Sequence, residues 1–136
     1  MPSAWLCGVR VRVLNDKKCI ITVKLNWFNS NPFKSLYWAV QGMASELATG
    51  LAIIDFANKN SLNISMLVVS NESRFLKKAK GKIRFECDEV SKIKKTLSSL
   101  SKNKTTDKIK LKSTGYDESG DVVSEFIYEW SFKLKL

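Results

Sequence analysis

The segment PFKSLYWAVQGMASELATGLAIIDF, from Pro32 to Phe56, decides the fold that this sequence predicts. Apolar residues recur in it at steps of three and four, which is the period of an amphipathic α-helix. Asn31 and Pro32 are typical of a helix start, and the polar run NKNS (58–61) ends the pattern. Many of the remaining positions carry alanine or glycine, so strands can approach this helix closely. The apolar positions are Leu36, Val40, Met43, Leu47, Leu51 and Ile54.

Glu46 is the one carboxylate between Lys34 and Asp55 in this segment. On a helical wheel it borders the apolar stripe, and most of its angular neighbours are small residues. A carboxylate in such a groove is partly desolvated, which raises its pKa and suits it to act as a base or a nucleophile. Two other interpretations are open: Glu46 could hydrogen-bond across a subunit interface, or reach solvent at a gap in a sheet.

Period-two alternation of apolar and polar residues surrounds the helix on both sides. It predicts two antiparallel strands within residues 9–27 and four more within ISMLVVSNESRFL (64–76), GKIRFECDEV (81–90), KIKLKSTGY (108–116) and VVSEFIYEWSFKLKL (122–136). A short helix is predicted between Val90 and Leu100. We therefore expect a single α+β domain over residues 1–136, in which a mostly antiparallel sheet wraps one long central helix.

Several function classes are excluded by composition. The chain has no histidine, so it can hold no Ser-His-Asp triad, no Cys-His pair and no histidine metal site, and we expect no metal. Its three cysteines, at positions 7, 19 and 87, form no CxxC pair. The first residues lack the apolar run of a signal peptide, and polar residues interrupt the long helix too often for a membrane span. We expect a cytoplasmic protein.

The net charge of +10, from 23 Lys and Arg against 13 Asp and Glu, predicts attraction to an anion. No RNA- or DNA-binding motif accompanies this charge, so nucleic acid is not the partner we expect. The favoured interpretation is a solvated lysine-rich surface. A phosphate-bearing ligand is the next, and a nucleic-acid-binding protein is kept as a third class that would bind any polyanion with a steep salt dependence.

The sequence resembles the hotdog-fold superfamily of acyl-CoA thioesterases in three features. These are the order of its elements, the segment NPFKSLYWAVQGMASELATG (31–50) and the segment SRFLKKAKGKIRFEC (73–87). Within it, the chain is similar to a domain-of-unknown-function branch related to phenylacetyl-CoA-type thioesterases. The resemblance extends from about Gly8 to Leu134. It implies a hotdog fold, an acyl-CoA substrate, and an assembly of two or more subunits.

The resemblance also implies roles for residues at the helix start. Many such thioesterases carry His-Gly-Gly there and a catalytic acid nine residues after the histidine. Aligning that acid with Glu46 places Tyr37, Trp38 and Ala39 at the His-Gly-Gly positions. Glu46 is then the base or nucleophile, and backbone N–H groups around Trp38 and Ala39 polarise the thioester carbonyl. Trp38 is bulky where glycine would admit substrate, so the site could be reshaped, blocked or assigned to another ligand.

Arg74, Lys77 and Lys78 are the candidate partners for the phosphates of coenzyme A, which is part of the substrate; no separate cofactor is expected. The alternative is a charged connection with solvated lysines. We expect a homodimer or a dimer of dimers, with FIYEWSFKLKL (126–136) as a strand that leaves an edge to pair. The sequence thus favours an acyl-CoA thioesterase, and the main alternative is a non-catalytic acyl-CoA or fatty-acyl binding protein of the same fold.

Overall fold

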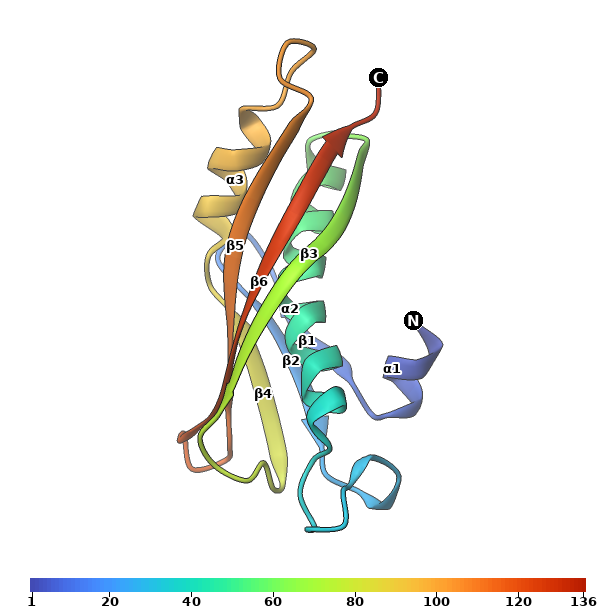
Figure 1. Ribbon diagram of the computed structural model, residues 1–136, viewed down its shortest axis with the longest axis vertical. Coiled ribbons are helices and arrows are strands. Elements are labelled where there is room, and N and C mark those ends of the chain that lie inside the picture. The colour runs from blue at the N-terminus through green and yellow to red at the C-terminus, as the bar shows by residue number, and fades with distance from the viewer.

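One antiparallel sheet of six strands curves around the long helix α2 in the computed structural model, which describes residues 1–136 (Figure 1). The strand order is β1-β2-β4-β5-β6-β3, and every neighbouring pair is antiparallel. This confirms the predicted α+β architecture. The elements are α1 (Pro2–Leu6), β1 (Arg10–Leu14), β2 (Cys19–Lys24), the 3-10 helix η1 (Trp27–Asn29), α2 (Trp38–Lys59), β3 (Ile64–Phe75), β4 (Lys82–Cys87), α3 (Val90–Ser98), β5 (Thr106–Tyr116) and β6 (Val122–Leu134).

Small side chains make the closest contact between α2 and the sheet. Ala44 and Ala48 are fully buried and Ala52 is 3% exposed, whereas Ile54 of the apolar stripe is 44% exposed. Because alanine projects little beyond the backbone, the strands can pack near the helix axis. Of the larger side chains of the stripe, Leu36 and Val40 are buried near the start of the helix, and Met43, Leu47 and Leu51 are half-buried.

The inner face of the sheet supplies the large core side chains. Phe85, Phe126 and Phe132 are almost fully buried, and each contributes about 1.5–3 kcal/mol through removal of apolar surface from water. The helix α3, predicted from its 3.6-residue period, extends the core beside β5 by burying Ile93 and Leu97 (Figure 1).

The free edges of the sheet are β1 and β3. The prediction that the C-terminal strand leaves an edge to pair is therefore wrong, because β6 lies between β5 and β3 and is paired on both sides. The pairing of β3 with β6 runs from Ile64 opposite Leu134 to Phe75 opposite Ser124. Residues 69–75 of β3 are exposed on both faces of the strand.

Two features of the first 37 residues differ from the predicted strands. Residues 2–6 form the short helix α1, which stands out from the body of the molecule (Figure 1). The second strand ends at Lys24, and Trp27 begins η1 with its side chain 91% exposed. Asn26 ends the strand because its side chain accepts hydrogen bonds from the N–H groups of Phe28 and Asn29.

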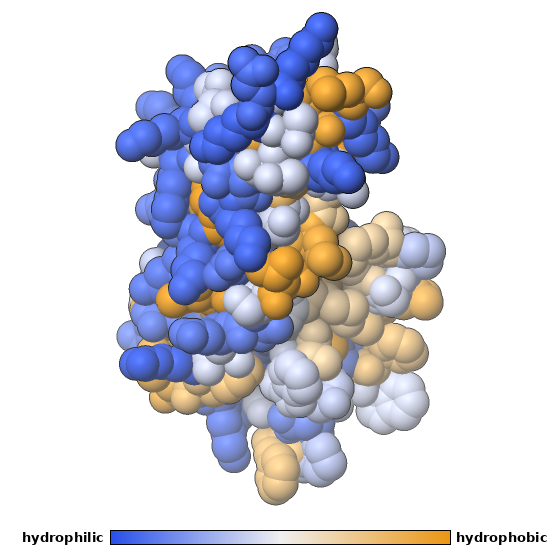
Figure 2. Space-filling view, turned by 45° about the horizontal axis from the view of Figure 1, so that its top comes forward, coloured by the Kyte–Doolittle hydropathy of each residue, from blue (hydrophilic) through white to orange (hydrophobic).

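The surface is divided between charged and apolar regions. Figure 2 shows hydrophilic side chains over most of the upper and left parts of this face, while apolar side chains reach the surface at the upper right, in the middle and at the lower right. Exposed aromatic residues include Trp5, Trp27, Phe28, Phe33 and Trp38. No helix has the length and apolar character needed to cross a membrane.

Candidate functional site

A cleft of about 700 Å³ opens at the N-terminal end of α2. One wall is the loop leading into the helix, residues 30–38, and the other is the connection that follows β3, residues 75–79. Gln41, one turn into α2, also lines it. We call this space the α2 cleft. Its volume is in the range that small-molecule sites occupy.

Local hydrogen bonds hold the loop that forms the first wall. The side-chain oxygen of Asn31 accepts from the N–H groups of Phe33 and Ser35, and Lys34 between them adopts a left-handed backbone with φ of 58°. Leu36 N–H donates to the carbonyl oxygen of Ala79 at 2.9 Å, which joins the two walls. The cleft is therefore built into the fold by backbone contacts.

The first turn of α2 presents free donors beside the α2 cleft. Tyr37 is the N-cap residue, and no side chain caps the helix. The N–H groups of Val40 and Gln41 both donate to the carbonyl oxygen of Tyr37, whereas those of Trp38 and Ala39 have no acceptor. These two N–H groups, at the positive end of the helix dipole, can stabilise a negatively charged oxygen. Trp38 lines the cleft with its side chain 57% exposed and leaves the space open.

The three candidate phosphate-binding residues have different surroundings. Lys77 Nζ lies 2.6 Å from Asp117 and 2.8 Å from Asp121, two carboxylates of the β5–β6 turn, and these hydrogen bonds raise the pKa of Lys77 to about 12. Lys78 Nζ lies 5.8 Å from the centre of the Phe33 ring, on the other wall. Arg74 lies on β3 opposite Glu125 and does not line the cleft. The structure thus brings Trp38, Lys77 and Lys78 together.

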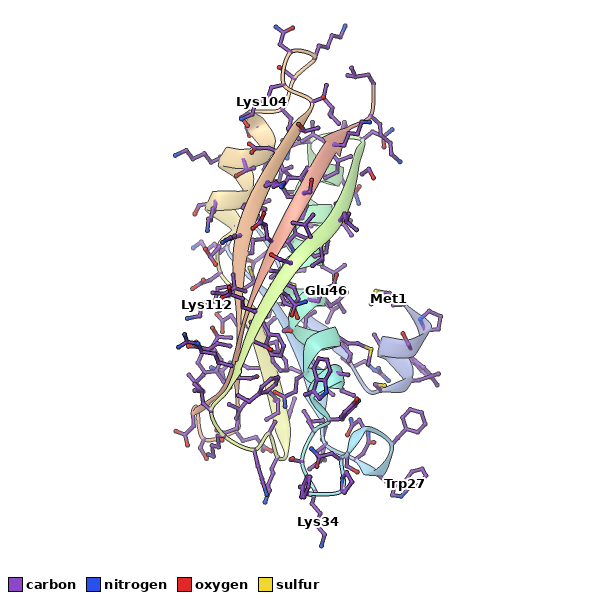
Figure 3. The ribbon with its side chains drawn as sticks, viewed as in Figure 1. Met1, Trp27, Lys34, Glu46, Lys104 and Lys112 are labelled. Carbon is purple, nitrogen blue, oxygen red and sulfur yellow. The ribbon has the colours of Figure 1, made fainter.

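Glu46 lies two turns further along α2 and does not line the α2 cleft. Figure 3 shows it at the middle of the helix, far from Lys34 in the loop. Its side chain is half-buried, and burial raises the pKa of Glu46 with no hydrogen bond or ion pair to oppose the shift. Within one chain, the predicted base Glu46 therefore lies apart from the predicted oxyanion donors, the N–H groups of Trp38 and Ala39.

Hydrogen bonds to β6 fix the flank of α2 that carries Glu46. Ser45 Oγ lies 2.6 Å from Tyr128 Oη, and Trp130 Nε1 donates to Thr49 Oγ1 at 3.0 Å. Burial is the main cause that raises the pKa of Tyr128 to about 12, so its hydroxyl stays neutral. Sequence reasoning missed this pairing. The available signal was Ser45 and Thr49 four residues apart on the helix, facing alternate aromatic residues of one strand.

Gln41 is a second residue of the site that sequence reasoning missed. Its side chain is 5% exposed, and its Nε2 donates a long hydrogen bond of 3.4 Å to the carbonyl oxygen of Leu36. Its Oε1 is buried without any hydrogen-bond partner. Buried acceptors are almost always paired in proteins, so this oxygen marks an unusual position in the cleft.

Comparison with known proteins identifies the fold. No protein-family model matches the chain, and no curated protein matches its sequence. Among solved structures, a Pseudomonas aeruginosa protein of unknown function described as a probable thioesterase superposes with a TM-score of 0.84 at 21% identity, covering 99% of this chain and 89% of that one. A Chlorobaculum tepidum protein of unknown function gives 0.86 at 13% identity, covering 99% and 88%.

A variant of a thioesterase enzyme from Staphylococcus aureus gives a TM-score of 0.75 at 11% identity, covering 98% of this chain and 99% of that one. Identities this low carry information about the fold alone, and they agree with the strand order and the wrapped helix described above. The chain therefore has the hotdog fold that the sequence resemblance implied, and it shares this fold with proteins described as thioesterases.

Proposed function

We propose that this protein hydrolyses acyl-CoA thioesters in the α2 cleft. The observation that carries the proposal is the uncapped start of α2, where the N–H groups of Trp38 and Ala39 are free and Trp38 lines the cleft. A thioester carbonyl oxygen that accepts from these groups gains stabilisation as negative charge develops on it. The thioesterases among the structural neighbours lend weaker support.

Glu46 is the proposed base. In this reaction a water molecule gives a proton to the Glu46 carboxylate while its oxygen bonds to the carbonyl carbon of the thioester. The electron pair of the carbonyl moves to its oxygen, which the N–H groups of Trp38 and Ala39 hold. The C–S bond then breaks, and the coenzyme A thiolate takes the proton from Glu46. The alternative is direct attack by Glu46, which forms an anhydride that water then hydrolyses.

A second subunit is part of the proposal, because Glu46 does not line the cleft of its own chain. The free edge of β3, exposed on both faces over residues 69–75, is the surface we propose for pairing in a homodimer. Pairing there would bring a partner protein next to the flank of α2 that carries Glu46. In this arrangement each catalytic site combines a carboxylate from one protomer with a cleft from the other.

Lys78 is the proposed main contact for the phosphates of coenzyme A. Its ammonium group lies at the cleft without a carboxylate partner, while Lys77 is already held by two aspartates. Arg74 is close in sequence but lies outside the cleft, so its contribution would be to attract the anionic ligand at longer range.

A non-catalytic acyl-CoA binding protein is the second candidate, and one observation favours it. Glu46 lies along α2 away from the cleft of its own chain. A protein that does not dimerise would therefore have a binding cleft with no base beside it. Such a protein would bind acyl-CoA with a preference for certain chain lengths and would release no thiol.

The test is thiol release from acyl-CoAs of short, medium, long and aromatic chains, using wild type and Glu46→Gln. Glu129→Gln on the outer face of β6 is the matched control, because it makes the same chemical change away from α2. We expect turnover in wild type and in the control, and loss of turnover in Glu46→Gln. Thiol release by wild type that persists in Glu46→Gln would overturn the role of Glu46, and saturable binding without thiol release would favour the binding protein.

A further inference from the structure

The α2 cleft contains an acceptor that thioester hydrolysis does not use. Gln41 Oε1 is buried with no hydrogen-bond partner, and Gln41 is one of the residues that line the cleft, with only 5% of the residue exposed. A buried acceptor without a partner lowers the stability of a folded protein, because the group loses its hydrogen bonds to water. A ligand that donates a hydrogen bond to this oxygen would remove that cost.

The position of Gln41 places this acceptor close to the free donors of the helix. Residues three apart on an α-helix lie on the same side, one turn along the axis, so the side chain of Gln41 follows the start of α2 at Trp38. The cleft therefore offers N–H donors at the first turn of α2 and one acceptor a turn further on. The other nearby walls are largely apolar, with Phe33, Leu36 and Leu76 among their residues.

The charge around the cleft limits the kind of donor that fits. The N-terminal end of α2 carries partial positive charge, and Lys78 adds a full positive charge at the wall. An ammonium donor would be repelled there. The cleft suits a molecule that has both a carbonyl oxygen and a neutral O–H or N–H group. The carbonyl oxygen accepts from the N–H groups at the start of α2, and the neutral group donates to Gln41 Oε1.

We infer that the α2 cleft selects thioesters that carry a neutral O–H or N–H donor within a few atoms of the thioester carbonyl, with Gln41 as the residue that determines this preference. The inference rests on the proposed function, since it assigns the carbonyl oxygen to the donors of Trp38 and Ala39. Two parts of a substrate can supply the donor: a hydroxyl group on the acyl chain, or the amide N–H of the pantetheine arm nearest the sulfur.

The experiment uses Gln41→Leu, which keeps a similar volume and removes both polar atoms, and four substrates of equal acyl length. These are a 3-hydroxyacyl thioester and the unsubstituted acyl thioester, each attached to coenzyme A and to ethanethiol, which has no amide. If the acyl hydroxyl is the donor, Gln41→Leu lowers kcat/KM for both hydroxyacyl substrates by about 10- to 100-fold and leaves the unsubstituted pair within about threefold. If pantetheine supplies it, both coenzyme A thioesters lose activity and both ethanethiol thioesters do not.

An equal change for all four substrates would overturn the inference, because Gln41 would then act only through the fold. The thermal midpoint of Gln41→Leu provides an independent check on folding, and we expect it to rise because the variant removes the unpaired oxygen. Gln41→Glu, which keeps an acceptor of the same shape, should retain more of the substrate preference than Gln41→Leu does.

Failure of the proposed hydrolysis can be separated from failure of this inference by a binding measurement. Ketone analogues of coenzyme A thioesters, in which a methylene group separates sulfur from the carbonyl, cannot be hydrolysed. Calorimetric titration of wild type with hydroxylated and unsubstituted analogues, and with pantetheine against butanethiol, measures the donor preference without turnover. A preference that Gln41→Leu abolishes supports the inference even when no thiol is released; equal affinities in each pair overturn it even when hydrolysis is intact.

Discussion

Tyr128 and Ser45 join the interior of the sheet to the middle of α2 through two hydroxyl oxygens 2.6 Å apart. Tyr128 Oη also donates to the carbonyl oxygen of Gly42 at 3.1 Å, one turn before Glu46 on the helix. Both side chains are at least 95% buried, so water cannot replace these hydrogen bonds. The contact holds the flank of α2 that carries Glu46 at a fixed distance from β6.

We therefore expect Tyr128→Phe to lower the free energy of unfolding by about 1–1.5 kcal/mol, since it removes the hydrogen bonds of Tyr128 and leaves the Ser45 hydroxyl with only the Gly42 carbonyl oxygen as a partner. Urea unfolding followed by circular dichroism measures the change. Tyr116→Phe, on β5, is the matched control, because the hydroxyl of Tyr116 makes no hydrogen bond within the chain, and its effect should stay within about 0.5 kcal/mol. Equal losses in both variants would contradict the assigned contact.

Gly42 and Gly50 both lie inside α2 but have different surroundings. A Cβ added at Gly42 would meet nothing within 4 Å, whereas one at Gly50 would lie 3.3 Å from the Trp130 ring. Alanine is a better helix former than glycine by up to about 1 kcal/mol, so Gly42→Ala should stabilise the protein by about that amount. Gly50→Ala should gain less, because the rigid indole must move. Urea midpoints for the two variants provide the comparison, and a larger gain at Gly50 would be evidence against the close approach of Trp130.

The raised pKa of Glu46 makes stability depend on pH in a defined direction. Its pKa in the folded protein lies above the ordinary value of 4.5 because burial disfavours the charged form. As the pH rises above that ordinary value, the unfolded chain releases the proton first, so the free energy of unfolding falls. It stops falling once the folded form has also ionised, and it stays lowered at higher pH. Glu46→Gln should therefore be more stable than wild type at neutral pH and about equal to it at pH values below the ordinary Glu pKa.

Unfolding free energies of wild type and Glu46→Gln across about pH 4 to 8 test this dependence. A constant difference between them would be inconsistent with a shifted carboxyl group. In the proposed hydrolysis, Glu46 must be ionised to act as a base, so kcat/KM should rise with pH through its raised pKa and not through the ordinary value. Glu129→Gln again serves as the control variant in both measurements.

Lys77 and Lys78 are neighbours in sequence with different expected roles. Lys77 is held by Asp117 and Asp121, so Lys77→Met should weaken the β5–β6 turn and lower the urea midpoint. Lys78 has no carboxylate partner and faces the cleft, so Lys78→Met should raise KM for coenzyme A thioesters and leave stability nearly unchanged. The effect on KM should shrink as salt concentration increases, because salt screens the attraction to phosphate. The reverse assignment of the two effects would show that Lys77 is the phosphate contact.

The order of elements could be predicted from the sequence because each segment carries a clear period. The apolar residues from Leu36 to Ile54 recur every three or four residues, and the segments around them alternate, so the change from helix to strand is visible in the residues themselves. The predicted start of the helix at Asn31 and Pro32 is wrong, because α2 begins at Trp38. The lone acid at Glu46 was visible for the same reason: it interrupts an apolar pattern. Its raised pKa follows from its placement on the border of the stripe, as expected for a half-buried carboxylate.

The remaining features depend on contacts between distant segments. Gln41 looks like an ordinary polar helix residue, and only the β3–β4 connection across the cleft encloses it and leaves its oxygen without a partner. The free edge of the sheet was assigned to the C-terminal strand, which is wrong, because the alternation of apolar and polar residues predicts strands but not their order in the sheet. The exposure of Trp27 was missed because Asn26 ends β2 through a local cap that competes with the strand pattern.

The position of β6 between β5 and β3 has a consequence for how the protein is made. Ile64 pairs with Leu134, so β3 emerges from the ribosome long before the strand that it needs as a neighbour. During synthesis β3 has no hydrogen-bonded partner on either edge, and α2 lacks the strand that holds Tyr128 against it. The sheet can close around β3 only after β6 has been synthesised, so residues 64–75 stay without a strand partner while β4 and β5 are made.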